Sequence, residues 1–194
     1  MLSSIHPLGE RARHNRWALT VTAFTMGTVI SGSLMGLALG AVGRAMASLG
    51  STGLLIATAV AALMAGALDM AGVQAPGPSR QVNETWIGAF RGWIYGGGFG
   101  LELGLGLVTY VVTWGVYATY LAALATASPT LGAVVGATFG LGRSLSLWLA
   151  AYVDRPSRLV SFNRCLASAG PIVRRASAVA FAVLGVGLIA GGAL

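Results

Sequence analysis

The sequence predicts an all-α, polytopic membrane protein with about five transmembrane helices. Long apolar stretches recur along the 194 residues, hydrophobic residues make up 56% of the chain against 9% charged, and the mean hydropathy is +0.78. A helix needs roughly 20 apolar residues to cross a bilayer core about 30 Å thick. The stretches leave no room for a soluble domain, so we expect a single integral membrane domain over residues 1–194.

Each predicted span is an apolar stretch long enough to cross a bilayer. The five spans are 17–43, 51–72, 97–126, 130–153 and 175–194. Residues 1–16 precede them as a basic tail. The first apolar stretch is much longer than the roughly 7–15 residues of a secretory-signal core, so we expect a retained anchor rather than a cleaved signal.

The arginines predict the orientation, because positive residues in short loops stay cytoplasmic. All twelve basic residues are arginine, and ten of them lie in the tail or in the gaps after the second and fourth spans. These ten are Arg11, Arg13, Arg16, Arg80, Arg91, Arg155, Arg158, Arg164, Arg174 and Arg175. With five spans, the tail and these two loops lie on the same side of the membrane. We therefore expect the N-terminus in the cytoplasm, the C-terminus outside, and the protein in the cell inner membrane.

The net charge of +7 is therefore read as a topology signal and as contact with anionic lipid headgroups. Nucleic acid is not expected as a partner, because no basic run stands beside an exposed aromatic platform. A partner membrane protein or a second copy of the chain is compatible with the pattern.

Two further segments predict short helices in the membrane interface. The stretch from Asn83 to Ala125 is too long for one crossing, and we expect Gly96-Gly97-Gly98 to break it. Before these glycines, Trp86, Phe90 and Trp93 recur at helical spacing. A plain extension of the third span is the alternative. Residues 157–168 have apolar and basic faces and predict a second interfacial helix, with a disordered basic loop as the alternative.

Two glycine ladders predict close helix packing. Gly32, Gly36 and Gly40 lie in the first span, and Gly132, Gly136 and Gly140 lie at the same spacing in the fourth. Glycines every four residues allow another backbone to approach closely in lipid. The two spans run in opposite directions in the predicted topology, so the ladders also suggest an inverted repeat of the kind found in transporters. Tight packing without a repeat is the alternative.

On these two ladders the chain resembles the transmembrane scaffold of cytochrome c biogenesis and thiol–disulfide interchange proteins. The resemblance implies a small glycine-rich bundle whose first and fourth helices are equivalent. The chain lacks that family's cysteine in each of those helices, and its single Cys165 lies in a predicted cytoplasmic loop. The family's redox function is therefore not implied. Related scaffolds that export small solutes or metals nevertheless favour transport.

Three charged residues lie within apolar spans, where a central charge costs on the order of 2.5–3.5 kcal/mol. Glu102 and Arg143 are predicted at a similar depth in the cytoplasmic half, and Asp69 is predicted nearer the inner end of its span. They indicate either a polar cavity that binds an anion or relays a proton, or an ion pair that holds helix register. For Asp69 alone the alternative is a solvated side chain.

The remaining motifs do not indicate catalysis. Tyr110, Trp114, Tyr117 and Leu121 form a stripe that could line a permeation path or a quinone-like site, or could simply pack. Two histidines in the tail and one cysteine give no metal, haem or cofactor site. We expect a non-enzymatic transport-type or scaffold-type bundle for a small solute, ion or proton, or alternatively an interaction subunit of a larger membrane complex.

Overall fold

The computed structural model describes residues 5–47, 51–77, 85–106 and 113–192, and every element within them is a helix. In chain order these elements are α1 (Pro7–Ala12), α2 (Trp17–Ala47), α3 (Ser51–Met70), α4 (Trp86–Ala89), α5 (Gly92–Gly104), α6 (Gly115–Ala125), α7 (Pro129–Trp148), the 3-10 helix η1 (Leu149–Tyr152) and α8 (Pro156–Gly192). The all-helical class is confirmed.

Three helices in the described part of the chain are long and apolar enough to cross a membrane, judged by length and composition. They cover Trp17–Ala47, Pro129–Tyr152 and Pro156–Gly187. Two shorter apolar helices, Leu55–Met70 and Gly115–Ala125, fall below that length. The structure thus contains three full-length candidate spans and two apolar helices of partial length.

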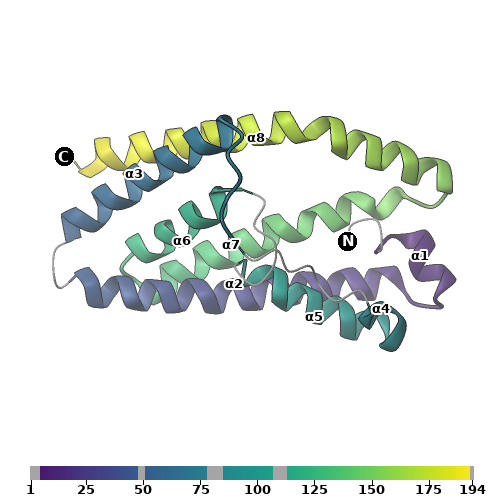
Figure 1. Ribbon diagram of the computed structural model, residues 1–194. Coiled ribbons are helices and arrows are strands. Elements are labelled where there is room, and N and C mark those ends of the chain that lie inside the picture. The colour runs from purple at the N-terminus through teal and green to yellow at the C-terminus, as the bar shows by residue number, and fades with distance from the viewer. Residues whose placement is uncertain (1–4, 48–50, 78–84, 107–112, 193–194) are drawn as a thin grey trace.

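Helix α2 packs against α5, α6 and α7, and its contact with α7 runs through the two predicted ladders (Figure 1). A Cβ atom on Gly32 would lie less than 3.0 Å from the Gly136 carbonyl oxygen, and one on Gly36 would overlap Gly132 in the same way. Real Cβ atoms essentially never come this close to a backbone oxygen. The two backbones can therefore approach this closely only because glycine has no side chain. Each ladder is the packing partner of the other.

The α2–α7 contact is reciprocal. A Cβ on Gly136 would overlap the Gly32 carbonyl, just as a Cβ on Gly32 would overlap that of Gly136. At the two ends of the contact, Gly40 packs on the carbonyl of Ser128 and Gly140 on that of Thr28. Residues 100 positions apart, such as Thr28 and Ser128, therefore occupy equivalent places on two antiparallel helices. The interface has a local two-fold relation.

A third glycine ladder joins α5 to the other side of α2. Gly96, Gly100 and Gly104 lie one turn apart, and a Cβ on any of them would come within 3.0 Å of a backbone carbonyl oxygen of α2. Helix α5 runs parallel to α2 and passes unbroken through Gly96-Gly97-Gly98. The prediction that these glycines break the helix is wrong, because packing on α2 stabilises glycines that would weaken an isolated helix.

The predicted third span, 97–126, is instead divided between α5 and α6. Helix α5 lies along the N-terminal half of α2, and α6 reaches its C-terminal end, where Gly43 meets the Leu124 carbonyl (Figure 1). Gly106, which has a φ of 68°, follows α5 and turns the chain out of its helical path. The two half-length helices stand where one continuous helix was predicted.

Helix α8 is also longer than predicted. It runs without a break from Pro156 to Gly192, with Pro171 inside it, so 157–168 is not a separate interfacial helix. It packs antiparallel along α3, with Gly66 near the Ala178 carbonyl and Gly185 near that of Ala59. The first predicted interfacial helix is reduced to the four residues of α4.

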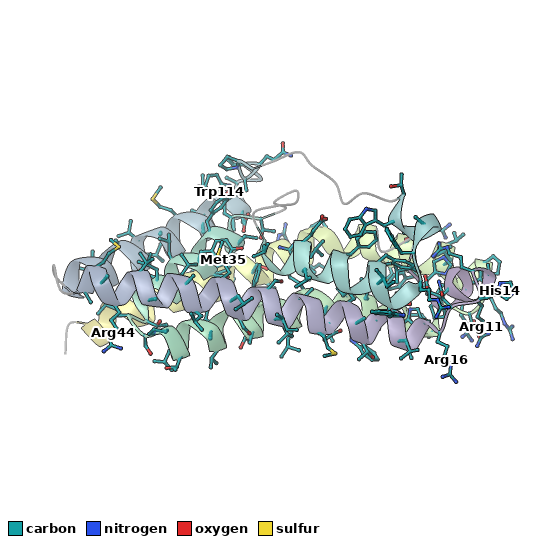
Figure 2. The ribbon with its side chains drawn as sticks, turned by 90° about the horizontal axis from the view of Figure 1, so that it is seen from below. Arg11, His14, Arg16, Met35, Arg44 and Trp114 are labelled. Carbon is teal, nitrogen blue, oxygen red and sulfur yellow. The ribbon has the colours of Figure 1, made fainter. Side chains whose placement is uncertain are left out.

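The labelled arginines lie at opposite ends of the bundle. Figure 2 shows Arg11, His14 and Arg16 at the end where α1 lies, and Arg44 at the far end of α2. We call these the α1 end and the Arg44 end. Helix α8 begins at the α1 end and returns along the length of the bundle (Figure 1).

Candidate functional site

The interruption between α5 and α6 lies about halfway along α2. Gly104 packs on Thr28, and Leu124 packs on Gly43. Helix α6 begins at Gly115, nine residues before Leu124. Because both helices rise about 1.5 Å per residue, its start lies level with the position nine residues before Gly43, which is position 34, near the middle of α2. Two helix ends therefore lie about halfway along the bundle rather than at its boundaries.

Asp69 lies at the beginning of α6. Its Oδ1 atom accepts a hydrogen bond of 3.0 Å from the backbone N–H of Trp114, the residue before the helix. The side chain comes from the last turn of α3, which ends where Gly72 adopts a φ of 73° and Val73 N–H bonds back to the Leu68 carbonyl. Asp69 is therefore level with the middle of the bundle, deeper than the inner-end position predicted for it.

The Asp69 carboxylate is incompletely satisfied. The residue is 4% exposed, and its Oδ2 atom is buried without a hydrogen-bond partner among the described residues. A buried polar atom in this state costs roughly 1–3 kcal/mol, and more when it carries charge. Such an atom marks a place where a ligand or ion can bind favourably.

Arg143 lies near the other end of the interruption. Its guanidinium is stacked over the Phe139 ring, 5.4 Å from the centroid, and is within electrostatic range of the Tyr120 hydroxyl. Tyr120 donates a hydrogen bond to the carbonyl of Leu105, the residue that caps α5. The Nη1 atom of Arg143 is buried and has no hydrogen-bond partner in the described part of the chain.

The charges at the interruption match the helix ends beside them. A helix is partially positive at its N-terminus and partially negative at its C-terminus. The acidic Asp69 lies at the N-terminus of α6, and the basic Arg143 lies near the C-terminal end of α5. This arrangement resembles the half-helix ends that hold charged solutes in transporters.

Glu102 and Arg143 lie at a similar depth, but they do not form an ion pair in the described structure. Gly104 and Gly140 both pack on the Thr28 carbonyl. Glu102 precedes Gly104 by two residues and Arg143 follows Gly140 by three, which puts both about 3–5 Å to the same side of Thr28 at helical rise. The ion pairs found among the described residues are Arg13–Glu10 and Arg158–Asp154.

Part of the predicted aromatic stripe borders Asp69. The rings of Trp114 and Tyr117 lie 5.9 Å apart, centroid to centroid. Trp114 Nε1 donates to the Val73 carbonyl at 3.0 Å, and the Tyr117 hydroxyl donates to the Pro76 carbonyl. Both rings thus pack against the segment that follows α3. Tyr110 lies outside the described residues.

A second buried polar cluster was not predicted. Glu10 of α1 is fully buried and accepts hydrogen bonds from Thr20 Oγ1 at 2.9 Å, Arg13 Nη1 at 2.8 Å and the Tyr95 hydroxyl. The cluster ties α1 to α2 and α5 at the α1 end. Residues 1–16 were predicted only as a basic tail, and the signal available in the sequence was a single acid among the tail's arginines.

His6 shows how the tail folds back. Its Nδ1 atom accepts a hydrogen bond of 3.1 Å from Gly9 N–H and so caps α1. Burial, with the nearby Arg13, lowers the pKa of His6, against an opposing effect of Glu10. A neutral imidazole is the form that can accept this bond.

We predict that Glu10→Ala lowers the free energy of unfolding by about 2–3 kcal/mol, because it leaves buried donors of Thr20 and Tyr95 without their acceptor. Reversible unfolding in detergent micelles measures the effect. Asp154→Ala removes an exposed carboxylate from an ion pair and should cost about 0–1 kcal/mol. Equal effects of the two substitutions would contradict a structural role for the Glu10 cluster.

Comparison with known proteins finds related sequences. The chain is 32% identical over 152 residues to the methylamine utilization protein MauF of Paracoccus versutus, covering 74% of this chain and 54% of that protein. It is 34% identical over 133 residues to MauF of Paracoccus denitrificans, covering 66% of this chain and 48% of that protein. The chain thus spans about half the length of the curated relatives it matches. No protein-family model matches the chain, and no solved structure matches it.

The apolar helices and the comparisons together support a coarse conclusion. The chain is a helical membrane protein, similar over most of its length to part of the methylamine utilization protein MauF. Within it, the interruption between α5 and α6 is where two buried charged side chains, Asp69 and Arg143, each with one atom lacking a hydrogen-bond partner among the described residues, lie beside helix ends. This interruption is the candidate functional site.

Proposed function

We propose that this protein is a transport-type membrane bundle that moves a small charged solute or ion and serves methylamine utilization. The observation that carries the proposal is the interrupted α5–α6 helix, flanked by unpartnered buried atoms of Asp69 and Arg143. The name of the MauF relatives supports the biological setting. The proposal assigns the chain no catalytic step and no cofactor.

The proposed topology has five crossings of a cell inner membrane, with the N-terminus in the cytoplasm and the C-terminus outside. The crossings are α2, α3 with the segment after it, α5 together with α6, α7, and α8. The positions of Arg11 and Arg16 at one end of the bundle support this orientation, because positive residues favour the cytoplasmic side.

The reciprocal α2–α7 contact supports an inverted repeat within the proposed bundle. Equivalent positions on two antiparallel helices, such as Gly36 and Gly136, are what a repeat of opposite topology produces. The same contact supports the proposal of a scaffold related to cytochrome c biogenesis and thiol–disulfide interchange proteins, without their redox chemistry. In transporters built from inverted repeats, the moving solute binds at the repeat interface near the bilayer midplane.

Arg143 is the residue through which we test the function. We predict that deleting the gene slows growth on methylamine as sole nitrogen source in the organism that encodes it, and that Arg143→Gln fails to restore growth although the protein reaches the membrane at normal levels. Loss of the buried guanidinium removes the charge beside the α5 end. Arg44→Gln, at the far end of α2, is the matched control and should restore growth. Normal growth of the deletion strain on methylamine would refute the proposed function.

An interaction subunit is the second candidate, and the exposure of α8 favours it. In the most apolar segment of α8, only 12% of the residues are buried by the rest of the protein, whereas 39% are buried in the corresponding segment of α2. Ile172 and Val173 are among its exposed side chains, near the exposed Arg175. Mass measurement of the complex in mild detergent discriminates the two candidates, because a stable hetero-complex favours a subunit role.

A further inference from the structure

The Asp69 carboxylate has few hydrogen-bond partners for a buried acid. One of its oxygens has a single hydrogen bond, from Trp114 N–H, and the other has none among the described residues. An ionised carboxylate can accept about four hydrogen bonds. Neither ion pair of the described chain involves Asp69. A buried carboxylate without a counter-charge is strongly unfavourable, so a positive ligand would stabilise it.

The position of Asp69 within α3 strengthens this requirement. It is the residue before Met70, at the C-terminus of α3, where the helix dipole is negative. A carboxylate at this end is unfavourable for its own helix. A bound cation would be attracted by the carboxylate and by the partial negative charge at the end of α3, against the partial positive charge at the start of α6.

Two aromatic residues stand at the start of α6, next to the hydrogen bond that Asp69 accepts. The Trp114 residue that donates to Asp69 also contributes the first ring, and Tyr117 lies one turn further. The indole N–H and the phenol O–H are already bonded to the Val73 and Pro76 carbonyls, so the ring faces are what the pair can still offer to a ligand. Ring faces attract organic cations by about 0.5–2 kcal/mol.

The available ligands favour a monovalent organic cation over a metal ion. No group of three or more His, Cys, Asp or Glu residues that could hold a metal occurs in the described ranges. Ca²⁺ and Mg²⁺ require about six oxygen ligands. A primary ammonium needs only a few acceptors, and its alkyl group suits an aromatic wall.

We propose that Asp69 and the Trp114–Tyr117 ring pair bind a small primary alkylammonium ion beside the N-terminus of α6. The inference rests on the proposed function, whose solute class it names. In this site the ammonium N–H groups donate to Asp69 Oδ2, and the alkyl group lies against the rings. Asp69 is thereby the residue that selects a positive solute.

The test is calorimetric titration of the purified full-length protein in detergent with methylammonium chloride, the smallest primary alkylammonium, at constant ionic strength. We expect saturable binding that Asp69→Asn weakens at least about tenfold, which corresponds to about 1.4 kcal/mol. The asparagine amide oxygen can still accept from Trp114 N–H, so the fold is expected to persist. Asp154→Asn, an exposed carboxylate at the start of α8, is the matched control and should bind like the wild type.

A second variant keeps the proposal testable if Asp69→Asn does not fold. Tyr117→Leu removes one ring without touching the Asp69–Trp114 hydrogen bond and should weaken methylammonium binding about threefold to tenfold. Absence of saturable binding to the wild type, unchanged affinity in both variants, or equal binding of sodium would each overturn the proposal. Binding of methylammonium is measured on purified protein in detergent, whereas the proposed function is measured by growth of cells on methylamine. A negative result in one experiment can therefore be distinguished from a negative result in the other.

Discussion

Replacing Gly136 with alanine should lower the free energy of unfolding by about 1–3 kcal/mol, the cost of overpacking a tight contact. The added Cβ would overlap the carbonyl oxygen of Gly32 on the facing helix, and a backbone atom cannot rotate away as a flexible side chain can. Helices α2 and α7 would have to separate along the whole ladder. Gly136→Leu should enlarge the effect and abolish recovery of monodisperse protein from detergent.

Gly142 on the same helix is the matched control. A Cβ at this position meets nothing within 4 Å, so no packing is lost. Alanine favours the helix by up to about 1 kcal/mol relative to glycine, and Gly142→Ala should therefore leave stability unchanged or raise it. The two substitutions are chemically identical but are expected to differ in sign. Equal changes in the unfolding free energy would refute the backbone contact between α2 and α7.

The sequence was sufficient to predict the two ladders, because glycines repeated every four residues in an apolar helix are typical of closely packed backbones. What it did not predict was that each ladder is the other's partner. Choosing a partner requires the relative rotation of two helices, which local spacing does not contain. The third ladder on α5 had the same spacing, but three consecutive glycines at Gly96-Gly97-Gly98 were interpreted as a helix break. Packing on α2 outweighed the low helix propensity of these residues.

The candidate site was predicted in part. Asp69, Glu102 and Arg143 were identified from the sequence alone, because a charged side chain in an apolar span has a high free-energy cost in lipid. The pairing of Glu102 with Arg143 followed from depth, and their depths are indeed similar in the structure, yet no ion pair joins them among the described residues. The depth of a residue along the bundle does not determine the direction in which its side chain points. The central position of Asp69 was missed because the end of the predicted span 51–72 was taken to lie at the inner boundary, whereas α3 ends beside the start of α6.

The break between α5 and α6 was misplaced for a related reason. Its signal, Gly106, is one glycine in a helix already rich in glycine, and its positive φ of 68° is visible only in the folded chain. The Glu10 cluster was not predicted at all, because its three hydrogen-bond donors come from α1, α2 and α5. Long-range hydrogen bonds of this kind have no local sequence pattern.

Gly106→Ala should disrupt the interruption and abolish growth on methylamine, while the protein still inserts into the membrane. Alanine in the left-handed region costs roughly 1–2 kcal/mol. Its Cβ would also overlap the Tyr120 hydroxyl, which holds the Leu105 carbonyl at the end of α5, and would lie 3.3 Å from the Phe139 ring that supports Arg143. The measurement is complementation of the deletion strain, with membrane levels checked by immunoblotting.

A double variant separates the two causes of that loss. Tyr120→Phe removes the oxygen that a Cβ on Gly106 would meet, so growth should recover partly in Gly106→Ala/Tyr120→Phe if overlap dominates, and should not recover if backbone strain dominates. Tyr120→Phe alone must retain activity for this comparison to hold. Full activity of Gly106→Ala would mean that the break tolerates a changed geometry. The unpartnered Arg143 and Asp69 atoms on either side of it would then be features of packing, since a solute site between two helix ends requires those ends to be held in place.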